Sequence, residues 1–319
     1  MVGVNMTTQT GTMNTKSKRR NPLLLLKKHW ELYFLLLPTM VYVLIFLYAP
    51  MGGVLIAFKE YSPTRGIFGS PWAGFKYFKR FFDSYVFWDI LYNTISLSIF
   101  NLIANFPIPI IFALLLHQIV SKKYKKFVQT VSYAPHFISM VVLVGILSVF
   151  LSPQTGILNI IIKLFGGDPV YFMGRPELFQ PLYVWSGVWQ NTGRAAIIYI
   201  AALAGINPEL HEAAMVDGAT KFQRAIHIDI PGIMPTAVIM LLLNLGQIMS
   251  IGFEKAFLMQ NNLNIVRSEI ISTYVYKLGL LGAQFSFATA VGLFNSVIGF
   301  ALVIAVNGIA RKLGDTSLW

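Results

Sequence analysis

The chain has 319 residues, of which 55% are hydrophobic and 12% are charged, and its mean hydropathy is +0.63. An ordinary soluble domain carries about a quarter charged residues, so this composition indicates an integral membrane protein. The formal charge is +12, but Lys and Arg gather beside apolar runs, which suits anionic membrane lipid and argues against nucleic acid as a partner. The absence of cysteine excludes disulfides, zinc–thiolate sites and iron–sulfur clusters.

Six stretches without acidic residues predict an all-α integral membrane fold with six transmembrane helices. A helix needs about 20 mostly apolar residues to cross the hydrocarbon core. The six stretches are residues 32–48, 91–116, 131–151, 182–204, 237–253 and 287–309. Only the fourth contains a formal charge, at Arg194. We therefore expect a cytoplasmic tail over residues 1–28, a transmembrane domain over 29–311 and a second tail over 312–319.

Lys and Arg near the helix ends predict the orientation in the membrane. If the N-terminus is inside, the inner segments hold fourteen basic residues and the outer segments hold nine. We therefore expect a multi-pass protein of the plasma or inner membrane with both termini in the cytoplasm. Residues 51–90, which are rich in Gly, Pro and aromatic residues, would then lie outside and form short interfacial helices.

The loop expected between the fourth and fifth helices, residues 205–235, carries more acidic than basic residues, unlike the other inner segments. This exception indicates a protein partner. Pro208 can begin a short helix with acidic residues in its first turn, where the helix dipole favours negative charge. Gly218 permits a sharp turn, after which a second short helix would run until Pro231 stops it.

The residues of this loop resemble the EAA loop of the permease subunits of type I ATP-binding-cassette importers. The family pattern is Glu-Ala-Ala, three residues, Gly, nine residues, Ile, one residue, Leu-Pro. This sequence matches every spacing and departs from the pattern only in having Ile230 in place of Leu. The resemblance implies coupling to an ATPase, with Glu212 paired to a basic group of that subunit. The residues that would form the coupling surface are Glu212, Ala213, Ala214, Asp217, Gly218, Ile228 and Pro231.

The likeness extends over most of the chain from about residue 22 and narrows to the carbohydrate-importing permeases of polysaccharide utilisation systems. The segments that carry it are residues 51–59, 70–75, 129–139, 273–279 and 317–319. The resemblance implies the type I importer permease fold, a second homologous permease subunit, two ATPase subunits and an extracytoplasmic solute-binding protein. It favours oligosaccharides from plant or algal polysaccharides as cargo, acidic ones such as alginate or pectin fragments among them.

The sequence contains no phosphate-binding loop of the form Gly, four residues, Gly-Lys-Ser or Gly-Lys-Thr. We therefore expect no cofactor on this chain, with ATP and Mg²⁺ bound by the partner ATPase subunits. The chain would be a transporter subunit and not itself an enzyme.

Polar side chains within the expected helices predict a substrate path, because in lipid such groups face other helices or a water-filled passage. Amide hydrogen bonds and aromatic faces are the groups that bind sugars. The candidates are Trp185, Trp189, Gln190, Asn191, Asn244, Gln247 and Asn295. Asn244, Gln247 and Ser250 are spaced by three residues and share one helical face. The alternative is that these groups form interhelical hydrogen bonds or interfacial anchors.

Other functions stay open at this stage. The same architecture could import a non-sugar solute such as a glycerol phosphate or a peptide, and Arg194 could contact either an acidic substrate or a structural partner. An ion-coupled carrier usually has acidic residues in mid-span, and none of the six stretches has one. A membrane-embedded enzyme would need paired carboxylates or a Ser–His pair, so no catalytic residue is expected. The five His residues have no second ligand at metal spacing along the sequence, so no metal site is expected.

Overall fold

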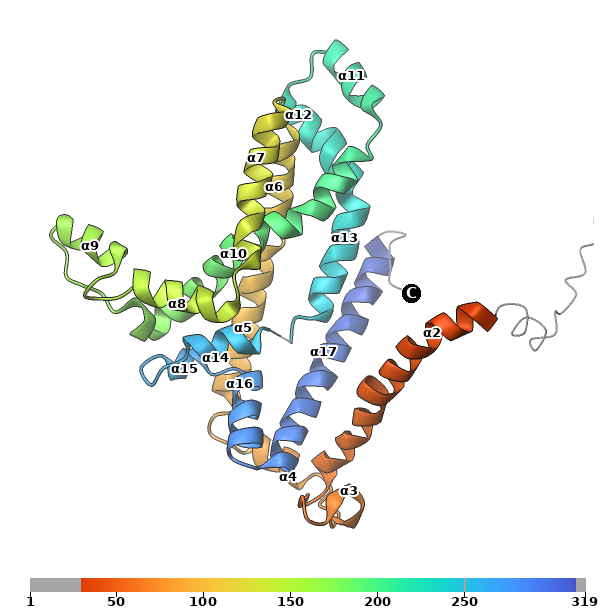
Figure 1. The fold of residues 1–319 in the computed structure, drawn as a ribbon, viewed down its shortest axis with the longest axis vertical. Coiled ribbons are helices and arrows are strands. Elements are labelled where there is room, and N and C mark those ends of the chain that lie inside the picture. Colours follow the sequence, from red (N-terminus) through yellow and green to blue (C-terminus); the bar gives the residue numbers. More distant parts are fainter. Residues whose placement is uncertain (1–29, 250, 314–319) are drawn as a thin grey trace, which may run out of the picture. The chain divides into compact units, whose positions relative to one another are not determined.

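The computed structural model describes residues 30–249 and 251–313, with side chains up to residue 308 (Figure 1). In this part of the chain all regular structure is helical apart from one antiparallel bridge between Lys59 and Trp72. The chain divides into two compact units, Met1–Gly53 and Val54–Trp319. Residues 1–28 and 314–319 of the two expected tails lie outside the described residues.

The first unit contains helix α2 (Trp30–Val43), the π-helical turn η1 (Leu44–Tyr48) and the start of the 3-10 helix η2 (Ala49–Phe58). None of the side chains of α2 is buried, although the helix is apolar on every face. A helix that is apolar all round is stable in a protein core or in lipid. This segment therefore has the character of a lipid-facing helix, and it begins the first candidate membrane span, Trp30–Phe58.

The second unit is a bundle of long helices linked by short ones, and α10 and α17 are the longest at 29 residues each. In chain order its helices are α3 (Gly66–Gly69), α4 (Lys76–Phe82), α5 (Phe87–Asn105), α6 (Pro107–His117), α7 (Lys122–Tyr133), η3 (Ala134–Phe137), α8 (Met140–Phe150), α9 (Ile157–Leu164), η4 (Phe172–Gly174), α10 (Pro176–Ala204), α11 (Pro208–Val216), α12 (Lys221–Arg224), η5 (Ala225–Asp229), α13 (Ile230–Gly246), α14 (Phe253–Met259), α15 (Ile265–Ser268), α16 (Ile271–Tyr276), η6 (Lys277–Leu281) and α17 (Phe285–Leu313).

Helix α10 lies at the centre of this unit and packs against α5, α6, α7, α13 and α15. Its start is encoded by Pro176 at the first helical position, which needs no hydrogen-bond acceptor, and by Glu177 in the positive first turn. Phe179, Val184 and Val188 point into the largest apolar cluster of the unit. The core therefore forms around the buried face of α10.

The segment between the first span and α5 folds on itself outside the long helices. Next to the bridge of Lys59 and Trp72, the ring of Trp72 stacks on Phe58 with centroids 5.8 Å apart. The Lys76 ammonium donates a hydrogen bond to Glu60, and this contact lowers the pKa of the exposed Glu60 carboxyl below its ordinary value. These local contacts hold the two short helices α3 and α4 beside the bundle.

Among the described residues, four helices are long and apolar enough to cross a membrane: Trp30–Phe58, Phe87–His117, Lys221–Gly246 and Phe285–Gly308. A fifth candidate is the pair Lys122–Phe137 and Met140–Phe150, bent by 98°. The straight helix expected over residues 131–151 is therefore not present. The chain bends where Ser139 caps α8 by accepting a hydrogen bond from the amide of Val142.

The fourth expected span lies within α10, which is long enough to cross a membrane but less apolar than the four. Gln190, Asn191 and Arg194 lower its hydropathy. The second span is divided at Phe106 into α5 and α6, because Pro107 has no amide hydrogen with which to continue the helix.

Close packing between α7 and α10 depends on Gly193. A Cβ atom at this position would lie 2.1 Å from the carbonyl oxygen of Ser132 and 2.8 Å from the ring of Tyr133. We expect Gly193→Ala to lower the free energy of unfolding by about 1–3 kcal/mol, the usual cost of overpacking. The measurement is the thermal unfolding midpoint of the protein purified in detergent.

The matched control is Gly145→Ala in α8, where a Cβ atom would have no neighbour within 4 Å. Alanine is the better helix former, so this change should leave the midpoint unchanged or raise it. Equal midpoints for the two variants would contradict the close contact of α7 with α10.

Candidate functional site

Two adjoining cavities lie among α5, α10, α13 and α14, with volumes of about 340 and 210 Å³. Asn101, Asn105, Tyr183 and Asn244 line both of them. The larger cavity is also lined by Gln190, Asn191, Arg194 and Lys255, and the smaller one by Gln247. The structure thus brings together four of the seven residues predicted for the substrate path: Gln190, Asn191, Asn244 and Gln247.

Several amide groups in these cavities are free to bind a ligand. Within the described part of the chain, the side-chain amides of Asn244 and Gln247 have no hydrogen-bond partner. Gln190 donates to the carbonyl of Ile138 at 2.8 Å, and its buried oxygen is left without a partner. Such amides can donate to and accept from hydroxyl groups, which is the chemistry that a sugar requires.

Other polar groups of the cavities are held in place by their neighbours. Asn105 donates to the side-chain oxygen of Asn101 at 2.8 Å, one helical turn away on α5. The oxygen of Asn191 lies 3.2 Å from Nδ1 of His136 in η3. These contacts join η3 to α10 and give the amide groups of the cavities a defined direction.

Two cationic side chains line the larger cavity, and none of the residues that line either cavity is acidic. Arg194 is exposed and has no ion pair or hydrogen bond to another described residue. Lys255 is buried, donates to the carbonyl of Tyr183 at 2.6 Å and lies 4.7 Å from the centre of the Tyr183 ring. The Arg194 guanidinium therefore gives the cavity a positive charge that no acidic lining residue neutralises.

Three of the predicted path residues lie elsewhere. Trp185 and Trp189 are exposed on α10 and do not line either cavity. Asn295 on α17 donates instead to the carbonyl of Met249 at 3.0 Å. Ser250, expected on the same face as Asn244 and Gln247, lies outside the described residues. The role of the two tryptophans stays a prediction.

Tyr183 and Lys255 line the larger of these cavities and were not predicted from the sequence. We placed Arg194 between two roles, and the structure puts its guanidinium on the cavity wall. Lys255 follows the fifth apolar stretch, which suggests a residue at an outer edge, yet the side chain is only 4% exposed. A single Lys in a short apolar helix, Phe253–Met259, is the one signal that could have indicated burial.

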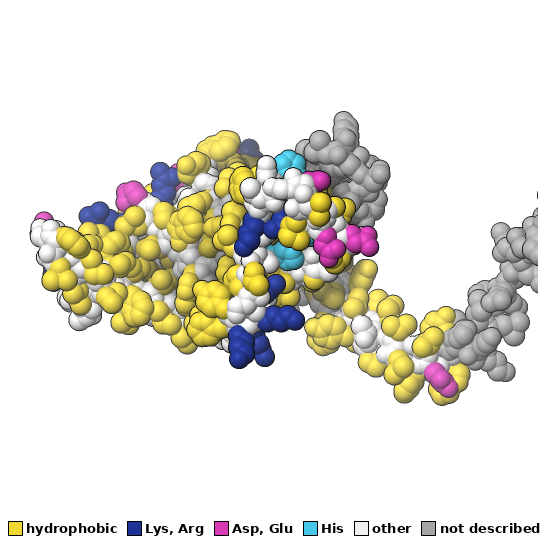
Figure 2. Space-filling view, turned by 90° about the horizontal axis from the view of Figure 1, so that it is seen from above, with side chains coloured by type: hydrophobic (Ala, Val, Ile, Leu, Met, Phe, Trp, Pro, Cys, Tyr) yellow, Lys and Arg dark blue, Asp and Glu magenta, His cyan; other side chains and the backbone are white. Residues whose placement is uncertain are grey.

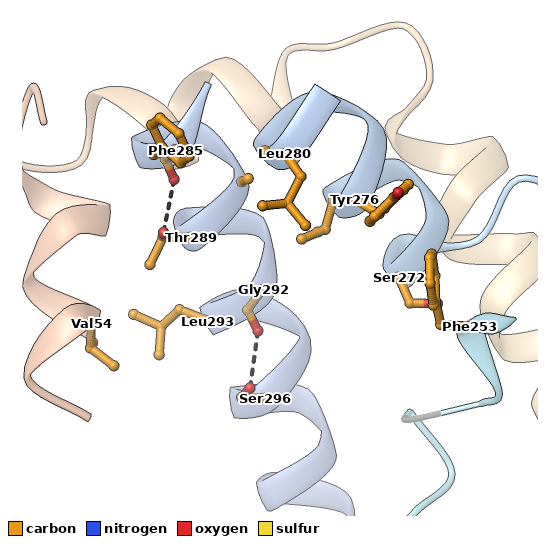
Figure 3. Close-up of a pocket in the computed structure, with 13 residues that line it drawn as sticks. Val54, Phe253, Ser272, Tyr276, Leu280, Phe285, Thr289, Gly292, Leu293 and Ser296 are labelled. Atoms are coloured by element: carbon orange, nitrogen blue, oxygen red, sulfur yellow. Dashed lines mark hydrogen bonds between the residues drawn. The ribbon is translucent and has the colours of Figure 1, made fainter. Parts of the chain in front are cut away.

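A larger cavity of about 610 Å³ lies beside α14, α16 and α17, and its lining is mostly apolar (Figure 3). The hydroxyls of Thr289 and Ser296 hydrogen-bond to carbonyls of their own helix, those of Phe285 and Gly292. Few polar groups are thus left to meet a sugar. The smaller polar cavities are the better candidates for a substrate path.

The loop with the EAA pattern folds as two short helices whose ends are fixed by caps. Asn207 accepts a hydrogen bond from the amide of Glu209 and so caps α11, with Pro208 next to it. Gly218 has φ +78° and ends α11 in the left-handed conformation, which glycine adopts without strain. The amide of Gly218 donates to Met215, and the amide of Ala219 donates to the carbonyl of Ala214.

This pair of hydrogen bonds is the Schellman motif, which requires a left-handed residue at the position of Gly218. The spacing from Ala214 to Gly218 in the EAA pattern therefore has a structural cause. After the turn, Thr220 and Gln223 form a reciprocal capping box at the start of α12. The loop is thus a defined helical hairpin.

The hairpin presents a mixed charged and apolar surface at one end of the bundle, the end from which Figure 2 is viewed. Glu212, Ala213 and Asp217 are exposed, as is Phe222 in α12. Basic residues of α7 gather at the same end, where Lys122, Lys123 and Lys126 are exposed. A surface of small and acidic residues in such a place suits a close protein partner.

Ile228 and Pro231 join the hairpin to the bundle. Ile228 is half-buried in η5, and Pro231 occupies the first turn of α13. Next to it, a Cβ atom on Gly232 would lie 2.6 Å from the side chain of Ile206. The two ends of the hairpin therefore meet in direct contact at the start of α13.

A bundle of apolar helices around polar cavities, with a capped helical hairpin at one end and no nucleotide-binding loop in its sequence, has the features of a transport permease. The chain belongs to the family of binding-protein-dependent transport system inner membrane components, whose model matches residues 105–315. This finding confirms the resemblance to the permease subunits of binding-protein-dependent importers.

Individual relatives are similar along nearly the whole chain. Protein LplB of Bacillus subtilis (strain 168) is 42% identical over 294 residues, which cover 92% of each chain. The polygalacturonan/rhamnogalacturonan transport system permease protein YteP of the same organism is 41% identical over 304 residues, 95% of each chain.

Two solved structures share the fold. One is a bacterial ABC transporter involved in the import of the acidic polysaccharide alginate, with a TM-score of 0.86, 42% identity and coverage of 92% of this chain and 100% of that chain. The other is a bacterial alginate ABC transporter in complex with an alginate pentasaccharide-bound periplasmic protein, with a TM-score of 0.85 and 42% identity. It covers 92% of this chain and 98% of that chain.

Proposed function

We propose that this chain forms half of the membrane channel of an ATP-driven importer and that its cargo is an acidic oligosaccharide. The observation that carries the proposal is the pair of adjoining cavities, which are lined by amides and by the basic side chains of Arg194 and Lys255, without an acidic residue. Amides bind sugar hydroxyls, and a guanidinium binds a carboxylate through two parallel hydrogen bonds. Both kinds of group meet where Arg194 lies near Asn191 and Asn244.

The relatives support the choice of cargo. One is a permease named for polygalacturonan and rhamnogalacturonan, and the solved transporter of the same fold imports the acidic polysaccharide alginate. The larger of the two polar cavities has a volume of about 340 Å³, which is near the lower limit of small-ligand pockets. We therefore expect it to hold only part of an oligosaccharide at a time.

We assign six spans and an inward-facing hairpin to the chain. Helix α10, with 29 residues, is about 44 Å long at 1.5 Å per residue and exceeds the hydrocarbon core of about 30 Å. It would serve as the fourth span, and the bent pair α7 and α8 as the third. Both termini and residues 205–235 would lie in the cytoplasm, and residues 51–90 outside.

The hairpin at residues 205–235 would receive movement from the motor subunits. Exposed Glu212 offers a charge for a basic group on an ATPase, and Ala213, Ala214 and Gly218 allow its surface to approach closely. The complex would comprise this chain, a second permease subunit, two ATPase subunits that bind ATP and Mg²⁺, and an extracytoplasmic solute-binding protein. This division of labour agrees with the lack of a phosphate-binding loop in the sequence.

The charge of Arg194 should determine the preference for acidic cargo. We expect Arg194→Gln to reduce uptake of an alginate or galacturonate oligosaccharide by about 10–100-fold, because a hydrogen bond to a charged group is worth about 1.5–3 kcal/mol. The measurement is ATP-dependent uptake of labelled oligosaccharide by the whole complex in proteoliposomes, with the substrate concentration varied.

The matched control is Arg175→Gln, which removes the same charge at the exposed start of α10, outside both cavities. This variant should transport like the parent protein. An equal loss in both variants, or no loss in either, would count against binding of a carboxylate by Arg194. Uptake of a small phosphate ester in place of the oligosaccharides would favour a non-sugar cargo for the same cavity.

The hairpin turn should be needed for coupling. We expect Gly218→Pro, combined with Glu212→Ala, to reduce ATP-coupled uptake at least about tenfold, since proline cannot adopt φ +78° and strain of this kind costs about 1–3 kcal/mol. Proline also removes the hydrogen bond to Met215. The readouts are uptake and ATP hydrolysis of the assembled complex.

Gly218→Asn is the matched control, because asparagine tolerates the left-handed conformation better than other residues with a side chain. It should keep most of the uptake. Unchanged uptake in the Pro and Ala double variant would refute the coupling role of the hairpin, whatever the cargo is.

A further inference from the structure

Three potential metal ligands from distant parts of the chain meet where the hairpin joins the bundle. His117 ends α6, His211 lies in α11, and Asp229 is the last residue of η5. One ligand atom from each of the three lies within 4.8 Å of the other two. These residues are not at metal-ligand spacing along the chain, so no metal site was predicted from the sequence. Folding alone brings them together.

The carboxylate of Asp229 is completely buried and only half satisfied. Its Oδ2 accepts a hydrogen bond from Nε2 of Gln118 at 3.3 Å. Its Oδ1 lies 3.2 Å from Nε2 of His211 and 4.0 Å from Nε2 of His117. Among the described residues, neither Oδ1 of Asp229 nor Nε2 of His211 makes a hydrogen bond with good geometry. A buried charged oxygen without such a partner is costly.

The separation of these atoms suits two ligands of one metal ion. Zinc binds imidazole nitrogen and carboxylate oxygen at about 2.0–2.2 Å, so tetrahedral ligand atoms lie about 3.3 Å from each other. Oδ1 of Asp229 and Nε2 of His211 are 3.2 Å apart, which is about 0.1 Å less than this separation. Nε2 of His117 is 4.0 Å from Oδ1 of Asp229, so the His117 ring must move toward the other two ligands, which its 29% exposed side chain permits.

We propose that His117, His211 and Asp229 bind one divalent transition-metal ion, with zinc as the ion that best suits two imidazoles and one carboxylate. Three protein ligands leave a fourth position for water on the side where the two histidines are partly exposed. Gln118 holds the second carboxylate oxygen and so orients Asp229 toward the ion. A direct ion pair of Asp229 with a protonated His211 is the competing arrangement.

The test is metal binding by the full-length chain, purified in detergent without an affinity tag. Equilibrium dialysis with Zn²⁺ should give one tightly bound ion per chain, and Co²⁺ should give the intense visible absorption of a four-coordinate site. Asp229→Asn, His211→Gln and His117→Gln should each weaken Zn²⁺ binding by more than the 10–100-fold that follows loss of an outer-shell partner.

His227→Gln is the matched control, because His227 is exposed in the same hairpin segment and hydrogen-bonds only to the backbone of Gln223. Its Zn²⁺ affinity should equal that of the parent chain. Asp229→Asn alters a buried group and could prevent folding. His117→Gln changes a partly exposed ligand and tests the site in that case. Zn²⁺ affinity that is the same in the parent and in His117→Gln, or that is absent from the parent, overturns the proposal in favour of the ion pair.

A bound ion would hold α11 to α6 and to the start of α13. This consequence rests on the proposed coupling role of the hairpin. In the assembled transporter, micromolar Zn²⁺ should then slow ATP-coupled uptake of the parent protein at least threefold and leave His211→Gln unaffected. Binding without any effect on uptake would refute the restraint of the hairpin while the metal site stands.

Discussion

A polar side chain on a membrane helix has no water to satisfy it, and this constraint shapes the arrangement of the second unit. Along α10, Tyr183, Gly187, Gln190, Asn191 and Arg194 follow one another at helical spacing and line the larger cavity. Trp185 and Trp189 lie between them in sequence and are exposed outside both cavities. The polar face of α10 faces the amides of α5 and α13 across the cavity, while Gln190 and Asn191 make their own hydrogen bonds with Ile138 and with η3.

Small residues on α10 make this arrangement possible. Gly187 has no side chain, and a Cβ atom there would lie 3.3 Å from the ammonium of Lys255. Gly193 lies against the backbone of Ser132, where a Cβ atom does not fit. One glycine therefore admits a cation to the cavity wall, and the other admits α7. Both glycines therefore let another element approach α10: Gly187 the Lys255 side chain of α14, and Gly193 the backbone of α7.

The apolar stretches and the EAA pattern predicted the helical membrane fold and the hairpin because both depend on neighbouring residues. The turn at Gly218 follows from the spacing to Ala214, which the Schellman motif requires. The bend at Ser139 was not predicted from hydropathy, because it depends on a local cap in which Ser139 accepts a hydrogen bond from the amide of Val142. Lys255 and Asp229 escaped prediction for another reason. Their burial depends on Tyr183 and Gln118, which are 72 and 111 residues away.

Helix α13 connects the hairpin with the polar cavities. It begins at Ile230, directly after the buried Asp229, and Asn244 near its other end lines both cavities. Seventeen residues give it a length of about 25 Å, so a displacement of η5 would reach Asn244 through a single rigid element. Its companion α10 leads from the cavity back to α11 through residues 205–207. Because α10 and α13 both end at the same hairpin, force applied at α11 would act on Arg194 and Asn244 together, and no separate pathway through side chains would be required.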